Sequence, residues 1–167
     1  MGKAAGSTGP SYRPHGLTGS LASAWRGLRQ AWLAERNLRI HAVFAWIVLA
    51  VAQLLRVSRL EFLILVIAVV LVIAAELANT ALELVTNLAA GGHRPMAGAT
   101  KNIAAAMVLV TAAGASVVGL GVFWPYLPQL PALTLSGLRS RPPVVLLHGA
   151  GILTLALAGL LVPRRRF

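Results

Sequence analysis

The chain of 167 residues contains no cysteine and no aspartate. The absence of cysteine excludes disulfides, thiolate nucleophiles and cysteine-ligated metal sites, and it leaves the redox compartment of the protein open. Acidic residues are scarce in general, since four glutamates stand against fifteen lysines and arginines. Carboxylate chemistry therefore rests on Glu35, Glu61, Glu76 and Glu83 alone.

Hydrophobic residues, in contrast, make up 57% of the chain, and the mean hydropathy is +0.77. Soluble domains of this size rarely reach such values. The net charge is +11, but the basic residues flank apolar runs, which fits lipid head groups and topology control better than nucleic acid binding. The composition predicts an integral membrane protein that binds no nucleic acid.

Periodicity and apolar runs divide the chain into segments. Residues 1–18 are rich in Gly, Ser, Pro and Thr and are expected to be disordered. Residues 19–37 place Trp25, Leu28 and Trp32 on one apolar stripe, which predicts an amphipathic helix at the membrane surface or, alternatively, one packed on other protein. The remaining expected segments are spans at 38–55, 60–86 and 103–124, a linker at 126–143, a fourth span at 144–162 and a basic tail at 163–167.

The distribution of basic residues predicts the orientation of these spans. With the N-terminus in the cytoplasm, eleven of the fifteen lysines and arginines face that side. Four spans would return the C-terminus to the same side, together with Arg164, Arg165 and Arg166. The first apolar run begins near residue 40, behind a long basic segment, so we expect it to be retained as a membrane helix rather than removed as a signal peptide.

One predicted span carries a polar stripe. Glu76, Asn79, Thr80 and Glu83 follow one another at i, i+3, i+4 and i+7, so they share one face of a helix. An ionisable residue inside a span costs roughly 2.5–3.5 kcal/mol on insertion scales and therefore indicates function. Interhelical hydrogen bonds offer a structural explanation for such a stripe. Two carboxylates on one face repel each other, however, and a divalent cation or a shared proton would relieve the repulsion.

The other two acids have different expected surroundings. Glu35 lies beside the apolar stripe of the amphipathic helix, so it is expected either to face a polar site or to pair with Arg36 or Arg39. Glu61 falls at the start of a predicted span near Arg59, where an acid is favourable to the N-terminus of a helix.

A basic, Gly-rich loop is expected at 87–102, directly after the carboxylate helix. Its paired glycines allow close backbone approach, and His93, Arg94 and Lys101 supply positive charge, which suits phosphate; a topology signal is the alternative explanation. The spacing is not that of a P-loop. Carboxylates that can hold Mg²⁺, beside a phosphate-binding loop at the membrane surface, favour transfer from a nucleotide to a lipid alcohol.

Three stretches of the chain resemble the small prokaryotic diacylglycerol kinase and undecaprenol kinase family. Residues 24–29 and 35–41 resemble the amphipathic N-terminal helix of the family and the start of its first span. Residues 76–83 resemble its specific signature, Glu-x-x-Asn-Ser/Thr-Ala-hydrophobic-Glu. Residues 93–102 resemble the loop that ends in Lys-Asp, and the likeness extends from about residue 20 to residue 123.

The resemblance implies a homotrimer of the bacterial inner membrane, with three spans per subunit, MgATP as cosubstrate and active sites shared between neighbours. It makes residues 19–125 the lipid-kinase core of an all-α membrane protein, followed by the additional fourth helix. Glu76 would act on the lipid hydroxyl, while Glu35 and Glu83 would bind the metal. The nucleotide-binding residues would be Ser23, Glu35, Glu83, Gly92, His93, Arg94, Lys101 and Asn102. The residues that line the lipid site would be Arg29, Trp32, Asn37, Arg39, Glu76 and Asn79.

The sequence departs from the family at Asn87 and Asn102, where the family has Asp. Asparagine keeps the hydrogen bonding but loses the charge, which puts metal or nucleotide affinity in question. The expected function is ATP-dependent phosphorylation of a membrane lipid alcohol, with undecaprenol preferred because residues 35–41 and 79–83 look more like that branch. Diacylglycerol as acceptor, a non-catalytic family member and a proton-coupled carrier that uses Glu76 are the alternatives.

Overall fold

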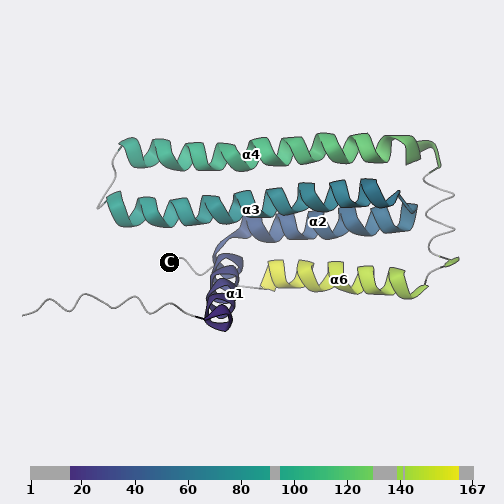
Figure 1. Ribbon diagram of the computed structural model, residues 1–167, viewed down its shortest axis with the longest axis horizontal. Helices are drawn as coiled ribbons and strands as arrows, with labels where there is room; N and C mark the ends of the chain where they lie inside the picture. The colour runs from purple at the N-terminus through teal and green to yellow at the C-terminus, as the bar shows by residue number, and fades with distance from the viewer. Residues whose placement is uncertain (1–15, 91–94, 130–138, 141, 162–167) are drawn as a thin grey trace, which may run out of the picture.

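The computed structural model describes residues 16–90, 95–129, 139–140 and 142–161, and nearly all of them are helical (Figure 1). The expected all-α fold is confirmed, since none of the described residues forms a strand. The disorder expected over residues 1–15 and the basic tail at 163–167 lie outside the described residues. The helices are, in order, α1 (Leu17–Ala34), α2 (Arg36–Leu55), α3 (Arg59–Ala90), α4 (Pro95–Phe123), η1 (Trp124–Gln129) and α6 (Pro142–Leu161).

Three segments are long and apolar enough to cross a membrane, namely Arg36–Leu55, Arg59–Ala89 and Pro95–Pro128. The sequence predicted three spans in this order, and the protein is an integral membrane protein. The apolar stretch within α6, Val145–Leu155, is shorter than these. A fourth membrane crossing therefore stays a prediction.

Two of the helices are longer than the apolar runs that predicted them. α3 continues to Ala90 rather than ending at 86, and α4 begins at Pro95 rather than at 103. Proline is favourable at the first position of a helix, because the N–H that it lacks is not needed there. Most of the loop expected at 87–102 is therefore helical, and Lys101 and Asn102 lie on α4.

The helices α2, α3, α4 and α6 lie side by side, and α1 lies across them at the N-terminus of α2 (Figure 1). α1 begins at Leu17, within the segment expected to be disordered, and it leaves Leu21 and Trp25 exposed, at 74% and 67%. An amphipathic helix across a bundle, with exposed apolar and aromatic side chains, has the geometry of a helix at a membrane surface. This favours the membrane over other protein as the partner of its apolar stripe.

The length of α3 determines where its polar stripe lies. The helix has 32 residues and is about 48 Å long, which exceeds a hydrocarbon core of ~30 Å. The C-terminal part of α3 and the N-terminal part of α4 extend beyond the start of α2 (Figure 1). α1 contacts both α2 and α3, and the charge of Glu35 at its C-terminal cap interacts with Glu76 and Glu83, so the stripe of α3 lies close to α1.

At the opposite end of the bundle, side chains cap the N-terminus of α3. The backbone N–H of Ser58 donates to Glu61 Oε2 at 2.7 Å, and the backbone N–H of Glu61 donates to Ser58 Oγ at 3.3 Å, which is a capping box. The hydroxyl of Tyr126 in η1 also donates to Glu61 Oε2, at 3.0 Å. Glu61 is thus an acid in the first turn of a helix, as expected, but its partners are Ser58 and Tyr126 rather than Arg59.

α6 is attached to the outer part of α2 by polar and aromatic contacts. Trp46 Nε1 donates to the carbonyl oxygen of His148 at 3.2 Å, and His148 Nε2 lies 3.0 Å from Gln53 Oε1. The rings of Trp46 and His148 pack edge to face, with centroids 5.8 Å apart. Gly151 allows this approach, because a Cβ atom at that position would collide with the Trp46 ring.

Candidate active site

The polar stripe of α3 faces the interior of the protein. The exposed fractions of Glu76, Thr80 and Asn79 are 2%, 5% and 8%, and Glu83 is half-buried. Polar groups in such surroundings are unfavourable unless they have partners or bind a ligand. The partners of each side chain therefore show which groups are available for chemistry.

Thr80 and Asn79 have partners within α3 itself. Thr80 Oγ1 donates to the carbonyl oxygen of Glu76 at 3.0 Å, so its hydroxyl is satisfied by its own helix. Asn79 Nδ2 donates to Glu83 Oε1 at 3.2 Å and so holds that carboxylate. Asn79 Oδ1 is buried and has no hydrogen-bond partner among the described residues. It remains available as an oxygen ligand beside Glu83.

Glu35 reaches the same region from the break between α1 and α2. Its backbone is extended, with φ −98° and ψ 115°, and its side chain is half-buried. Burial raises the pKa of the Glu35 carboxyl, the nearby charge of Glu83 raises it further, and Arg39 opposes both effects. Glu35 forms no ion pair with Arg36 or Arg39, although all three residues are described. This favours the polar-site interpretation of Glu35 over local pairing.

Arg39 stabilises the junction of α1 and α2 that carries Glu35. The side chain is 3% exposed, and its Nη1 donates to the carbonyl oxygens of Trp32 and Leu33 at 2.8 and 3.3 Å. Carbonyls in the last turn of a helix lack partners within that helix, and a basic side chain can supply them. Arg39, which the sequence predicted at the lipid site, thus fixes the corner between α1 and α2.

A residue that the sequence analysis did not select contacts the most buried acid. His41 Nε2 lies 3.2 Å from Glu76 Oε1, and the two side chains are 26% and 2% exposed. The available signal was an ionisable side chain within a predicted span, which by itself indicates function. Its pairing with Glu76 joins two different helices, so helical periodicity could not reveal it.

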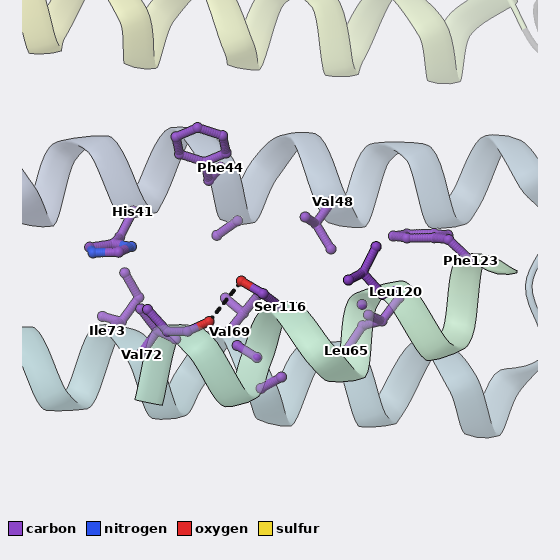
Figure 2. A pocket seen from close by; sticks show the side chains of 15 residues that line it. His41, Phe44, Val48, Leu65, Val69, Val72, Ile73, Ser116, Leu120 and Phe123 are labelled. Carbon is purple, nitrogen blue, oxygen red and sulfur yellow. Dashed lines mark hydrogen bonds between the residues drawn. The ribbon is translucent and has the colours of Figure 1, made fainter. Parts of the chain in front are cut away.

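His41 also lines an apolar groove between α2, α3 and α4, with a volume of about 560 Å³ (Figure 2). The groove runs from His41 and Ile73 at one end to Leu65 and Phe123 at the other (Figure 2). Small-molecule sites commonly have roughly 300–1,000 Å³ and are mostly apolar with a few polar groups. This groove fits that description and ends at His41, which contacts Glu76.

Lys101 lies where α4 passes the end of α3. Its Nζ donates to Asn87 Oδ1 at 2.7 Å. Because the asparagine is uncharged, this bond positions the lysine without neutralising it. The arrangement suits a lysine that binds phosphate.

The remaining predicted residues are spread around this region. Ser23 is exposed on α1, where its Oγ donates to the carbonyl oxygen of Gly19 at 3.0 Å and accepts from Arg26 Nη2 at 2.8 Å. Trp32 is half-buried, and Arg29, Asn37 and Asn102 are exposed. Three positions lie outside the described residues, namely Gly92, His93 and Arg94.

The carboxylates of Glu35 and Glu83 fit a magnesium ion whose remaining ligands are phosphate oxygens and water. Within the described part of the chain, no group of three or more His or Glu side chains is placed to hold a metal ion by itself. Mg²⁺ is usually bound by one or two carboxylates together with substrate phosphates and water. Glu35 and Glu83 supply two carboxylates close enough to repel, and Asn79 Oδ1 lies unpaired beside Glu83.

Comparison with known proteins identifies the class to which this site belongs. Residues 22–123 match the prokaryotic diacylglycerol kinase family. The chain belongs to this family and is a membrane lipid kinase that uses ATP as its phosphoryl donor. α6 lies beyond the matched residues.

Individual relatives carry two different names. The chain is 35% identical to the undecaprenol kinase of Bacillus subtilis over 108 residues, which cover 65% of this chain and 88% of the relative. It is 37% identical to the diacylglycerol kinase of Synechocystis sp. over 101 residues, covering 60% of this chain and 58% of the relative. The diacylglycerol kinase of Escherichia coli (strain K12) is 28% identical over 101 residues, covering 60% and 83%. No solved structure matches the chain.

Proposed function

We propose that the protein transfers the γ-phosphoryl group of ATP to undecaprenol and forms undecaprenyl phosphate. The observation that carries this proposal is buried Glu76, which shares one helix face with Glu83 and contacts His41 at the end of an apolar groove. The groove offers an apolar chain a place beside the carboxylates, which lie near the surface helix. The similarity to an undecaprenol kinase over 88% of its length supports the choice of lipid.

Each carboxylate has a proposed role that follows from its surroundings. Glu76 activates the lipid hydroxyl, because it is the buried acid that contacts His41 at the end of the groove. Glu35 and Glu83 bind Mg²⁺ together with the phosphates of ATP, and Asn79 orients Glu83. Bound there, Mg²⁺ would neutralise charge on the transferring phosphoryl group. Lys101 binds the phosphates as a positive charge held by Asn87.

The other predicted residues are assigned to the same two ligands. Arg39 acts on the site by fixing the corner that carries Glu35. We propose a homotrimer with shared active sites, in the bacterial inner membrane with a cytoplasmic N-terminus; light scattering with the detergent mass subtracted tests the trimer. The further nucleotide-binding residues are Ser23, Gly92, His93, Arg94 and Asn102, and the further lipid-binding residues are Arg29, Trp32 and Asn37.

Diacylglycerol is the second candidate acceptor. The Synechocystis and Escherichia coli relatives are named diacylglycerol kinases, and the first of these has the higher identity over its matched segment, at 37%. Its match covers only 58% of that relative, however. The neutral residues Asn87 and Asn102 raise the further alternative of a non-catalytic family member.

A phosphorylation assay with both lipids distinguishes these candidates. Purified protein in mixed micelles would receive radiolabelled ATP, Mg²⁺ and either undecaprenol or diacylglycerol. We expect a higher kcat/KM with undecaprenol and near-background turnover for Glu76→Gln. Faster turnover of diacylglycerol would assign the second candidate, and Mg²⁺-dependent turnover of neither lipid would contradict the kinase activity of this chain.

A further inference from the structure

Three arginines lie at the end of the bundle opposite the carboxylates. Arg56 caps the C-terminus of α2, Arg59 begins α3, and Arg139 lies shortly before α6, and all three are exposed. The C-terminal end of α2 and the N-terminal ends of α3 and α6 lie at the same end of the bundle (Figure 1). Under the predicted topology this is the outer side, where basic residues are disfavoured. The position of these arginines therefore needs an explanation other than topology.

The backbone of Arg56 indicates that its side chain is needed at that position. Arg56 has φ 54° and ψ 44°, and it is the one non-glycine residue with positive φ among the described residues. Its backbone N–H donates to the carbonyl oxygen of Gln53 at 3.3 Å and so ends the helix. Glycine or asparagine usually occupies such a position, because a larger side chain at positive φ is unfavourable. An arginine there is better explained by its guanidinium than by its backbone.

The guanidinium of Arg56 connects α2 to the start of α6. Its Nη2 donates to Ser140 Oγ at 3.1 Å. A guanidinium has five N–H donors in a planar fork, so this bond leaves most of them for another acceptor. Because Arg139 directly precedes Ser140, the same contact brings a second arginine to this corner, and Arg59 follows Arg56 by three residues. Such a set of guanidiniums matches an anion with several acceptor oxygens, such as phosphate.

No acid balances the charge of this corner among the described residues. The acid at this end is Glu61, whose Oε2 accepts from the backbone N–H of Ser58 and from the hydroxyl of Tyr126. The three arginines form no ion pair with any described acid. Three positive charges against the one negative charge of Glu61 leave a net charge of +2. The corner therefore attracts an anion.

Exposed apolar side chains continue from this corner along the helices. Leu60 follows Arg59 on α3 and is 68% exposed, and Leu146 and Leu147 near the start of α6 are 72% and 64% exposed. A free phosphate would contact the guanidiniums alone, whereas the acyl chains of a phospholipid would also cover these leucines. The corner lies at the ends of helices that are long and apolar enough to cross a membrane, which is the depth of lipid head groups.

We propose that Arg56, Arg59 and Arg139 bind the phosphate of an anionic phospholipid in the leaflet opposite the carboxylates. The phosphate accepts hydrogen bonds from arginines at the ends of α2 and α6, so the lipid holds α6 against α2. Because the corner has a net positive charge, phosphatidylglycerol is bound in preference to phosphatidylcholine, whose choline group cancels the charge of its phosphate. The inference goes beyond the proposed function and does not depend on it.

Photocrosslinking tests the position of the lipid. Because the chain has no cysteine, a photoreactive maleimide can be attached next to the site at Leu60→Cys. Leu88→Cys is the matched control, since Leu88 is 86% exposed near the other end of α3. Purified protein in detergent would be illuminated with phosphatidylglycerol or phosphatidylcholine, and mass spectrometry would identify the captured lipid.

We expect preferential capture of phosphatidylglycerol at Leu60→Cys and loss of this preference when Arg56→Gln and Arg139→Gln are added. The same two substitutions should not alter capture at Leu88→Cys. Equal capture of both lipids at Leu60→Cys would overturn the inference, as would a preference that persists without the two arginines.

A titration followed by native mass spectrometry measures the affinity. Arg56→Gln/Arg139→Gln should bind phosphatidylglycerol about 25-fold more weakly than the parent, because each basic side chain near an anionic lipid contributes about fivefold. Arg26→Gln/Arg36→Gln removes two exposed arginines at the other end of the bundle and should bind like the parent. A loss of less than about threefold in the site variant, or an equal loss in the control, would overturn the inference.

Thermal unfolding in detergent reports whether each variant is folded. If the double variant at the site is not folded, Arg59→Gln takes its place and should weaken the binding of phosphatidylglycerol about fivefold. Unchanged binding by a folded Arg59→Gln would then overturn the inference.

Inorganic phosphate, titrated into the lipid-free protein by calorimetry, distinguishes a lipid site from a site for a free anion. Phosphatidylglycerol should bind at least about tenfold more tightly, because its acyl chains bury additional apolar surface. Equal affinities would overturn the lipid as the ligand. The kinase assay is independent of these results: a parent that phosphorylates neither lipid alcohol leaves this inference standing, and failure of this inference leaves the proposed function standing.

Discussion

The four glutamates of the chain differ in the partners that hold them. Glu61 is satisfied by Ser58 and Tyr126 at one end of the bundle. Glu35, Glu76 and Glu83 lie at the other end, where their charges act on one another. A protein with so few acids thus uses one for a helix cap and places the other three within reach of one another's charge.

Replacing a proposed metal ligand with its amide should change the requirement for magnesium. Glu35→Gln and Glu83→Gln each remove one negative charge, so we expect at least about a tenfold rise in the Mg²⁺ concentration that gives half-maximal activity. Glu61→Gln, at the far end of α3, is the matched control and should leave this concentration unchanged. A Mg²⁺ titration at saturating ATP makes the measurement. If both site variants need the same Mg²⁺ concentration as the parent for half-maximal activity, Glu35 and Glu83 are not metal ligands.

Asn87→Asp tests whether the neutral partner of Lys101 matters for nucleotide binding. The aspartate would still accept the bond now made at 2.7 Å, but it would neutralise the lysine. We expect the KM for ATP to rise about two- to fivefold, which corresponds to one surface ion pair, and the effect to shrink in high salt. Steady-state kinetics at two ionic strengths measure it. A lower KM would mean that Lys101 needs an acidic partner to be positioned.

Residues that share a helix could be predicted, whereas contacts between helices could not. Glu76, Asn79 and Glu83 lie together because i, i+3 and i+7 fix a common face regardless of the rest of the fold. The contact of His41 with Glu76 and the bonds from Arg39 to α1 depend on how separate elements pack. The periodicity of one segment does not determine how that segment packs against the others.

Among the helices, three of the predicted spans are confirmed, whereas the C-terminal end of α3 and the start of α4 were not predicted. Apolar runs identify the part of a helix that lies in lipid, and the lengths of three such runs sufficed. α3 and α4 continue past those runs, because a backbone helix does not need apolar side chains once it leaves the hydrocarbon core. Lys101 was therefore expected in a loop and lies instead on α4.

Gly151→Ala should loosen the contact of α6 with α2. A Cβ atom at this position collides with the Trp46 ring, whereas one at Gly149, which is the matched control, meets nothing within 4 Å. Because the chain has no cysteine, Arg56→Cys and Ser140→Cys can be joined by a bifunctional maleimide; their native side chains bond at 3.1 Å. We expect the crosslinking yield to fall with Gly151→Ala and to be retained with Gly149→Ala. Equal yields would contradict this account of the packing.

At the scale of the whole molecule, basic residues and the surface helix agree on one orientation. The exposed apolar stripe of α1 favours a membrane surface near the carboxylates, and the predicted topology assigns most lysines and arginines to the same side. Nucleotide and lipid would then approach the site from opposite directions, one from water and one from the bilayer. Because ATP is available in the cytoplasm, this arrangement predicts a cytoplasmic N-terminus.

Single cysteines at two exposed positions test the orientation. We expect a membrane-impermeant maleimide to label Ser140→Cys in intact cells, and to label Ser20→Cys only after the membrane has been opened. Each variant serves as the control for the other, and the parent without cysteine gives the background. Labelling of Ser20→Cys alone in intact cells would reverse the topology.

The hydrogen bond from Tyr126 to Glu61 has a mechanical consequence. Together with the bond from Lys101 to Asn87, it connects α4 and the η1 turn that follows it to both ends of α3. A slip of one turn, about 5.4 Å, would break both bonds, so the bonds oppose sliding of α4 along α3 in a thinner or thicker bilayer. A common tilt of the two helices keeps both bonds and is therefore the favoured response. Bilayer thickness then alters how deeply the lysine sits relative to the lipid surface, while its height relative to Glu83 stays constant.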